Sequence, residues 1–504
     1  MTITVEQPRL DTLDAIISGT GWDSTLPRCG PEDRERMLRS VEVLRGALES
    51  DQEVYGITRG FGPLVLYSAD DSQELQGNGL ISHLGTSQGE PLSPDVCRMV
   101  VWLRLNSMRQ GYSGVSPDFW DRLADLWNRG FTPAIPQEGT VSASGDLQPL
   151  AYAALAHTGR GQAWQRAEDG TFALVPAEKA IRDLGAEPLD WSAREALAFV
   201  NGTSVGLAVA VHNHAEIRRI NRSVAGLTAR IAGLFGANPQ AYHSGFGVVR
   251  NQEGQLRVAE WIRRALPENH EYDPERPLQE PYSIRCVPQI LGAVEDQLDF
   301  IGEILRREAT GCTDNPICHE GEVLHGGNFH AMPVGLGSDQ LGLCLQQVAY
   351  LADRQLALLC NPSTNGGLNP MLTPRPGSGS GLAGVQLSST SFASKIRQLA
   401  YPSSLTTLPT NGWNQDHVPM ALNGATSVAE AVKLAWLIVG SLAVGVAQYA
   451  ALGGGDTEGD PLWKELERVS PPLDRDRPLA EEVRAAADAV RGAADSWLVE
   501  DQFA

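Results

Sequence analysis

Two long stretches of the chain, residues 341–359 and 428–452, consist mostly of apolar and small side chains. Both have the length of a helix, and their few polar residues leave no broad face for water. A helix that is hydrophobic nearly all round must be buried on most sides. In a soluble protein, these stretches therefore predict a central helical bundle that is shared between subunits.

Caps and apolar spacing predict further helices along the chain. Ser93-Pro94 and Ser116-Pro117 each place an N-cap residue before a proline at the first helical position. Apolar residues recur at helical spacing over residues 286–305, and a further helical stretch covers residues 479–498. Few segments alternate with period two, so the pattern of the chain is mostly helical.

Composition excludes several classes of protein. The chain has 504 residues, of which 42% are hydrophobic and 20% charged, which is enough for a sizeable core and excludes a disordered chain. Its formal net charge of −21 argues against a nucleic-acid partner, because phosphates would be repelled. The apolar run at residues 434–447 is shorter than the ~20 residues of a membrane span, so we interpret it as a buried helix and expect no membrane partner.

The N-terminus and the cysteines indicate a cytoplasmic protein. The first residues show no basic region followed by an apolar run, so we predict no signal peptide. Seven cysteines, an odd and sparse set, predict reduced thiols. Cys312 and Cys318 lie near His319 and His325, but their spacing differs from the usual zinc pattern, so we predict no metal.

Residues 139–150, with the sequence GTVSASGDLQPL, are the segment most informative about chemistry. Ser144 in this segment has three interpretations. A nucleophilic serine needs a His/Asp pair or a lysine, and the G-x-S-x-G elbow is missing. A plain turn is typical of Ser, Gly and Asp. In a backbone cyclisation, the Gly145 amide nitrogen attacks the Ala143 carbonyl carbon and Ser144 loses its hydroxyl. Glycine lets its nitrogen approach closely, alanine adds little bulk, and the product is an electrophile.

These twelve residues resemble, position by position, the signature of the ammonia-lyases and aminomutases that carry a 4-methylideneimidazole-5-one (MIO) group. That family includes histidine, phenylalanine and tyrosine ammonia-lyases. Further segments resemble those of the family in the expected order: residues 55–62, 200–204, 279–286, 314–316, 326–330 and 414–417.

The resemblance implies an all-α fold, with a long central helical bundle and an intertwined homotetramer whose active sites lie where three subunits meet. We accordingly expect one interlocked subunit with an N-terminal MIO-bearing region (1–200), a central helical bundle (201–475) and a C-terminal helical segment (476–504). The implied cofactor is MIO, formed autocatalytically from Ala143-Ser144-Gly145, with neither PLP nor metal. The chain has only four lysines, which fits an enzyme without a lysine aldimine: Lys179, Lys395, Lys433 and Lys464.

The resemblance also implies roles for single residues. Tyr55 would take the β-proton of the substrate, and a phenol with a pKa near 10 acts as a base only where its surroundings lower that value. Arg285, whose guanidinium is planar and bidentate, would bind the substrate carboxylate. Other residues are expected to orient the substrate or the MIO oxygen, or to pack beside the ring: Asn201, Gln279, Tyr282, Asn315, Phe329 and Asn414.

Two positions bear on the substrate. His83-Leu84 corresponds to the pair that faces the substrate ring, which is His-Leu in tyrosine-selective members, although histidine lyases also have a His there. Gln415 stands where histidine lyases place a glutamate. Arg59 and Trp413 depart from the family pattern near this pocket.

We therefore expect non-oxidative elimination of ammonia from L-tyrosine to give trans-p-coumarate. The alternatives are a histidine or phenylalanine ammonia-lyase, and an aromatic 2,3-aminomutase that uses the same electrophile and gives a β-amino acid. A PLP-dependent lyase and a scaffold protein with a degenerate site remain as alternatives from other classes.

Overall fold

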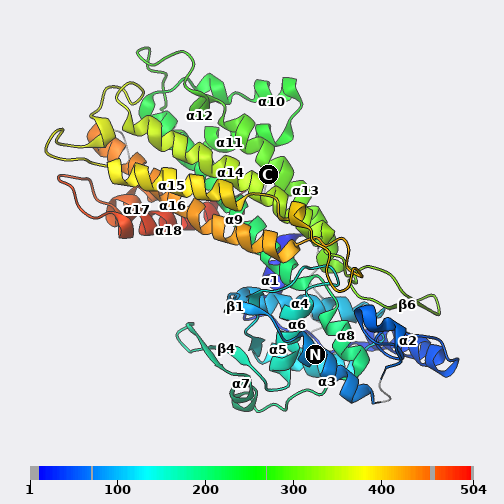
Figure 1. Cartoon of the computed structure of the whole chain (residues 1–504). Coiled ribbons are helices and arrows are strands. Elements are labelled where there is room, and N and C mark those ends of the chain that lie inside the picture. The colour runs from blue at the N-terminus through cyan, green and yellow to red at the C-terminus, as the bar shows by residue number, and fades with distance from the viewer. Residues whose placement is uncertain (1–10, 70–71, 268, 454–459, 501–504) are drawn as a thin grey trace, which may run out of the picture. The chain divides into compact units, whose positions relative to one another are not determined.

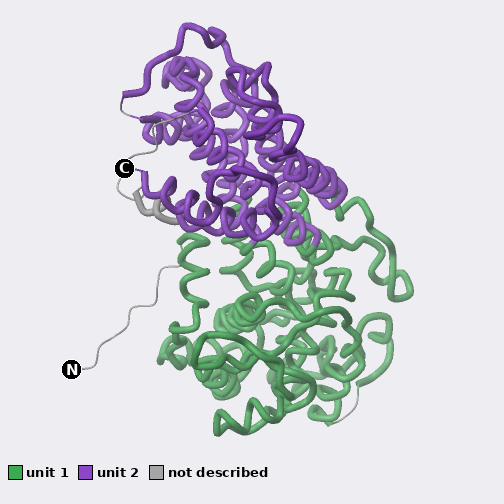
Figure 2. Tube along the Cα trace, turned by 90° about the vertical axis from the view of Figure 1, so that its left-hand side faces the viewer, with its two compact units in different colours: residues 1–212, 301–339, 402–426 green, residues 213–300, 340–401, 427–504 purple. Residues whose placement is uncertain are grey.

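The computed structural model describes residues 11–69, 72–267, 269–453 and 460–500, and helices dominate it (Figure 1). The chain divides into two compact units, each built from three separate segments (Figure 2). Unit 1 comprises residues 1–212, 301–339 and 402–426, and unit 2 comprises residues 213–300, 340–401 and 427–504. The regions predicted from the sequence are contiguous, whereas both units are discontinuous.

Unit 1 combines short helices with small sheets. Its helices are α1 (Leu13–Gly19), α2 (Pro31–Glu49), η1 (Gly62–Leu66), α3 (Gln73–Leu84), α4 (Pro94–Arg109), α5 (Pro117–Asn128), α6 (Leu147–His157), α7 (Ala177–Asp183), α8 (Ala193–Val200) and η4 (Ser403–Thr406). Its antiparallel sheets pair β1 (Gln88–Pro91) with β3 (Pro136–Glu138), place β4 (Gln162–Arg166) between β2 (Thr132–Pro133) and β5 (Phe172–Pro176), and pair β6 (Ile317–His319) with β7 (Glu322–Leu324).

Among the described residues of unit 2, the regular elements are all helices and there is no strand. Four long helices run from one unit into the other, so that a boundary between the units falls inside each of them. They are α9 (Ser204–Phe235), α13 (Val287–Thr310), α14 (Met332–Cys360) and α16 (Ala421–Gly453). The others are η2 (Pro239–Tyr242), α10 (Ser244–Arg250), α11 (Glu253–Ala265), α12 (Tyr282–Arg285), η3 (Pro370–Leu372), α15 (Ala383–Leu399), α17 (Pro461–Val469) and α18 (Ala480–Glu500). The prediction of an all-α fold is confirmed.

The two apolar stretches of the sequence lie in α14 and α16, which pack closely within unit 2. A Cβ built on Gly440 of α16 would overlap the backbone oxygen of Val483 in α18, and a Cβ on Gly445 would lie 2.7 Å from a methyl carbon of Leu356 in α14. Residues 193–235 and 421–453 have the length and composition of a membrane span. Because 89% and 78% of their most apolar windows are buried, both are typical of core helices.

The serine caps and the thiols that the sequence predicts lie among the described residues. Both serine caps are placed as predicted, and the Ser116 hydroxyl accepts hydrogen bonds from the first turn of α5. Ser93 precedes α4 without such a bond, so only the backbone defines this cap. All seven cysteines are free thiols, while a cytoplasmic location stays a prediction.

The core of unit 1 encloses a histidine among aromatic rings. His157 is fully buried at the end of α6, and its Nδ1–H donates to the Ala153 carbonyl at 2.7 Å. Its ring lies 4.9 Å from Phe131, 5.8 Å from Phe199 and 6.3 Å from Trp191 between centroids. Its Nε2 has no hydrogen-bond partner in the described part of the chain. Burial therefore lowers the pKa of His157 to about 4.

We expect His157 to make unit 1 acid-sensitive. The unfolded chain takes up this proton near pH 6.5 and the folded chain only near pH 4, so stability is present above pH 6.5 and falls as the pH drops. The free energy of urea unfolding should fall by about 2 kcal/mol between pH 7 and pH 5 through this residue. His157→Gln should remove that loss, whereas His319→Gln, on the exposed hairpin, should leave it intact. An unchanged pH slope in His157→Gln would contradict this assignment.

Candidate active site

The loop before α6 carries Ala143-Ser144-Gly145, called the tripeptide below, and Asp146 ties this loop to the start of α9. The Asp146 carboxylate accepts hydrogen bonds from the amides of Val205 and Gly206, at 3.0 and 2.8 Å, and from the Ser142 hydroxyl at 2.7 Å. Asp146 is fully buried, and burial raises its pKa although these hydrogen bonds favour the carboxylate. A negative group at a helix N-terminus satisfies amides that the helix itself leaves free.

Gly145 lies directly against the backbone of Gly202. Its φ is +74°, and a Cβ at this position would overlap the Gly202 nitrogen and lie within 2.6 Å of its carbonyl carbon. The Asp146 amide donates a hydrogen bond to the Gly202 carbonyl at 2.7 Å, which holds the two backbone segments together. Both the φ angle and the lack of space therefore require glycine at position 145.

Ser144 lies between two amide side chains. Its carbonyl oxygen accepts a hydrogen bond from Asn201 Nδ2 at 2.8 Å, and its hydroxyl accepts one from Gln415 Nε2 at 2.7 Å. Asn201 is 3% exposed, and its Oδ1 has no hydrogen-bond partner among the described residues. An unpaired buried amide oxygen is costly unless a further donor fills the site.

These features fit the MIO group. The chain turns at Gly145, where φ is +74°, and the Ser144 carbonyl, which would become the ring carbonyl of MIO, already accepts a hydrogen bond from Asn201. Among the described residues there is no group of three His, Cys, Asp or Glu side chains arranged to hold a metal.

A cavity of about 910 Å³ opens beside Ser144 within unit 1. The sequence-predicted residues that line it are Tyr55, His83, Leu84, Ser144, Gly145, Asn201 and Gln415. Further residues that the sequence did not indicate also line the cavity, among them Phe61, Gln76, Gln148 and Asn411. Phe61 lies in the glycine-rich segment that carries Tyr55, and its position in this segment could have indicated that it lines the cavity.

Tyr55 is held at three points. Its Oη accepts from the Gly62 amide at 2.8 Å, its own amide donates to His325 Nε2 at 3.1 Å, and its ring meets Phe61 edge-on at 6.1 Å between centroids. Burial raises the pKa of Tyr55, and the Gly62 hydrogen bond opposes this only in part. A tyrosine that acts as a base needs a lowered pKa. The surroundings of Tyr55 within unit 1 do not lower its pKa.

His83 projects from the last turn of α3 toward the same cavity. Its Nδ1 lies 3.1 Å from the Gly79 carbonyl, and its ring lies 6.4 Å from Phe61 between centroids. A carbonyl can only accept, so Nδ1 carries the proton and Nε2 of the neutral ring keeps a lone pair. The ring can thus accept a hydrogen bond from a ligand hydroxyl.

Other predicted residues of unit 1 do not line the cavity. Ala143 is buried in a small cluster with Val418 and Met420. Asn315 Oδ1 accepts from the Gly326 amide at 2.6 Å. Phe329 is half-buried, and Asn414 is exposed.

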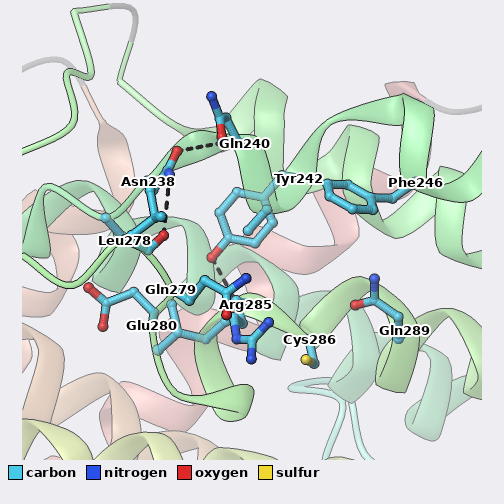
Figure 3. A pocket seen from close by; sticks show the side chains of 13 residues that line it. Asn238, Gln240, Tyr242, Phe246, Leu278, Gln279, Glu280, Arg285, Cys286 and Gln289 are labelled. Atoms are coloured by element: carbon cyan, nitrogen blue, oxygen red, sulfur yellow. Dashed lines mark hydrogen bonds between the residues drawn. The ribbon is translucent and has the colours of Figure 1, made fainter.

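The remaining predicted residues belong to unit 2. Gln279 and Arg285 line a cavity of about 220 Å³, together with Tyr242 and Glu280 (Figure 3). Tyr282 is 68% exposed, and the Arg285 guanidinium lies over its ring at 4.7 Å from the centroid. Arg285 Nε is buried and has no hydrogen-bond partner within the described chain.

The family model described as aromatic amino acid lyase matches residues 14–470. The chain belongs to this family. The class predicted from the twelve-residue segment, the MIO-dependent lyases and aminomutases, is thereby confirmed.

Its relatives in the family differ in substrate. A histidine ammonia-lyase from Geobacillus kaustophilus (strain HTA426) is 36% identical over 387 residues, which is 75% of each chain. The structure of tyrosine aminomutase from Streptomyces globisporus is similar with a TM-score of 0.89 and 27% identity, over 98% of both chains. Pantoea agglomerans phenylalanine aminomutase gives a TM-score of 0.88 and 25% identity, over 95% of this chain and 97% of that chain.

We expect the variants Gly145→Ala and Gly130→Ala to separate the energetic cost of a left-handed backbone from the cost of steric overlap. Both glycines have positive φ, but a Cβ on Gly130 would meet nothing within 4 Å. Each substitution should cost about 1–2 kcal/mol of unfolding free energy for the left-handed backbone. At Gly145 the overlap with Gly202 should add about 1–3 kcal/mol or more. Equal losses in urea unfolding of the two variants would contradict the close contact.

Proposed function

We propose that the chain eliminates ammonia from L-tyrosine to give trans-p-coumarate, using MIO that it forms from its own tripeptide. The observation that carries this proposal is the cavity of unit 1, which brings Ser144 together with Tyr55 and His83. Family membership supports ammonia chemistry on an aromatic amino acid. Once formed, MIO would supply an electrophilic methylidene carbon for the substrate amine.

The residues around Ser144 have a clear task in this proposal. Asn201 donates to the Ser144 carbonyl, and a fixed donor at this oxygen stabilises negative charge that develops there. Gln415 is an uncharged amide that donates to the Ser144 hydroxyl, which helps that hydroxyl to leave. A glutamate at this position would accept rather than donate.

Tyr55 is the proposed acceptor of the β-proton. The Gly62 amide stabilises its phenolate, while burial favours the neutral phenol and raises the pKa. The active fraction of Tyr55 therefore grows as the pH rises through the alkaline range. A cation brought by the substrate or by another subunit would shift this rise to lower pH.

His83 supports tyrosine as the substrate. Its protonated Nδ1 is bound to Gly79, so Nε2 is left to accept the phenol O–H of a substrate whose ring lies against Phe61. A site that hydrogen-bonds a hydroxyl discriminates strongly against the analogue that lacks it. The uncharged Gln415 offers no carboxylate to an imidazole ring, which weighs against L-histidine.

We also propose that the enzyme is a homotetramer. Gln279, Tyr282 and Arg285 belong to unit 2, and an exposed tyrosine with an arginine over its ring is suited to serve a site on a neighbouring subunit. Large apolar side chains such as Val249, 85% exposed, also favour assembly. In this arrangement Arg285 would bind the substrate carboxylate, and an isolated subunit would be inactive.

An aromatic aminomutase is the second candidate, favoured by the similarity to the tyrosine aminomutase structure. Incubation with L-tyrosine, L-phenylalanine and L-histidine, followed by chromatography of the products, tests these proposals together. We expect p-coumarate from L-tyrosine as the main product. A β-amino acid in place of the enoic acid would overturn the lyase proposal, and preferential conversion of L-histidine would overturn the substrate assignment.

Ser144→Ala and Tyr55→Phe should separate cofactor formation from proton transfer. Ser144→Ala should yield a folded protein without lyase activity, and its tryptic peptide 130–160 should lose no water from position 144. Tyr55→Phe should keep the modified peptide mass and lose roughly 100-fold or more in kcat, because the proton acceptor is gone. Appreciable turnover by Ser144→Ala would refute the role of the serine.

His83→Phe should move selectivity from L-tyrosine toward L-phenylalanine. The substrate phenol would lose its acceptor, at a cost of about 2 kcal/mol, which corresponds to roughly a 30-fold change in the ratio of kcat/KM values. Leu75→Ala is the matched control, because this exposed residue lies on the same helix and does not line the cavity. An unchanged ratio in His83→Phe would remove His83 from substrate recognition.

A further inference from the structure

A buried arginine lies against Gly202, the glycine that contacts the tripeptide. Arg104 of α4 is 1% exposed. Its Nη1 donates to Thr313 Oγ1 at 3.0 Å, its Nη2 donates to the Ala198 carbonyl, and its Nε has no hydrogen-bond partner in the described residues. A buried guanidinium bound only to neutral oxygens is costly, and burial lowers the pKa of Arg104.

The guanidinium of Arg104 lies against the backbone of Gly202. A Cβ built on Gly202 would overlap Nη1 and Cζ of Arg104, and would lie 3.0 Å from Thr313 Oγ1. Gly202 also contacts Gly145, because a Cβ built on Gly145 would fall on the Gly202 peptide. Gly202 is therefore in close contact with both the guanidinium and the tripeptide, and Arg104 fills the space into which a side chain at Gly202 would project.

This close contact bears on how MIO forms. The Gly145 nitrogen must bond to the Ala143 carbonyl carbon, and its hydrogen passes to the carbonyl oxygen. That hydroxyl then leaves as water with the Ser144 amide hydrogen, giving a C=N bond. Ser144 loses its Cα hydrogen and its hydroxyl as a second water, giving the methylidene. No oxidant or reductant is needed, so the protein has only to hold the reacting atoms close together.

We propose that Arg104 is a positioning residue for this cyclisation, acting as a rigid support behind Gly202 that holds Gly145 against Ala143. The inference rests on the proposed MIO chemistry. The same support would also hold the two residues next to the contact, one on each segment. Asn201 donates to the Ser144 carbonyl, and the Asp146 amide donates to the Gly202 carbonyl. A misplacement of about 1 Å can slow a reaction that depends on orientation by roughly 100-fold.

Arg98 provides a matched control on the same helix. It is also 1% exposed, its Nη1 donates to the Trp127 carbonyl at 2.9 Å and its Nε to the Thr20 carbonyl at 3.1 Å. Its guanidinium lies over the Trp127 ring, 3.5 Å from the centroid. Arg98 thus holds unit 1 together without contact to Gly202.

The test compares Arg104→Met and Arg98→Met with the wild type in the full chain. The readouts are the mass of the tryptic peptide 130–160, the far-UV circular dichroism spectrum and the unfolding temperature. We expect both variants to lose stability, while only Arg104→Met slows the loss of two waters, by roughly 100-fold in a time course after expression. Arg104→Lys keeps the charge but not the flat guanidinium, and it should slow the reaction less.

The outcomes are distinct. Complete dehydration of folded Arg104→Met, as fast as in Arg98→Met, would overturn the role of Arg104 and leave the MIO proposal intact. If Arg104→Met does not fold, dehydration of Arg104→Lys at the wild-type rate would overturn the role in the same way. A wild-type peptide of unmodified mass would instead refute the MIO proposal, and the role of Arg104 with it.

Discussion

The contact between the backbones of Gly145 and Gly202 is the constraint on which the chemistry of unit 1 depends. Two residues without side chains allow the peptides to touch, and the positive φ of Gly145 turns the chain so that the tripeptide folds back on itself. The same contact aligns Asp146 with the first amides of α9 and Asn201 with the Ser144 carbonyl. A side chain at Gly145 would push the two peptides apart, whereas a side chain at Gly202 would displace Arg104.

Charge acts locally in this acidic protein. The net charge of −21 does not favour an anionic group, so the proposed recognition of a substrate carboxylate would depend on a single cation such as Arg285. Within unit 1, Arg194 forms a buried ion pair with Asp314, next to Asn315, whose side chain accepts from the Gly326 amide. The attraction within such a buried pair is offset by the cost of removing both charges from water.

The sequence was sufficient where the signal is local. The tripeptide, the serine caps before α4 and α5, and the apolar stretches of α14 and α16 were all readable from adjacent residues. Helix α9 was not singled out, because polar residues such as Asn213 and Asn221 interrupt its apolar pattern, although both are buried. The assignment of Arg285 to unit 2, the burial that raises the pKa of Tyr55 and the contact of Gly202 with Arg104 all depend on residues far apart in the chain, so no local pattern could predict them.

The mass of the wild-type tryptic peptide 130–160 tests the central claim most directly, since trypsin cleaves after Arg129 and Arg160 and leaves the tripeptide intact between them. If the chain builds its own electrophile from Ala143-Ser144-Gly145, this peptide is lighter than its sequence by two water molecules, and fragmentation places the loss between residues 143 and 145. A peptide with the full mass of its sequence would contradict the formation of MIO and, with it, the proposed lyase mechanism.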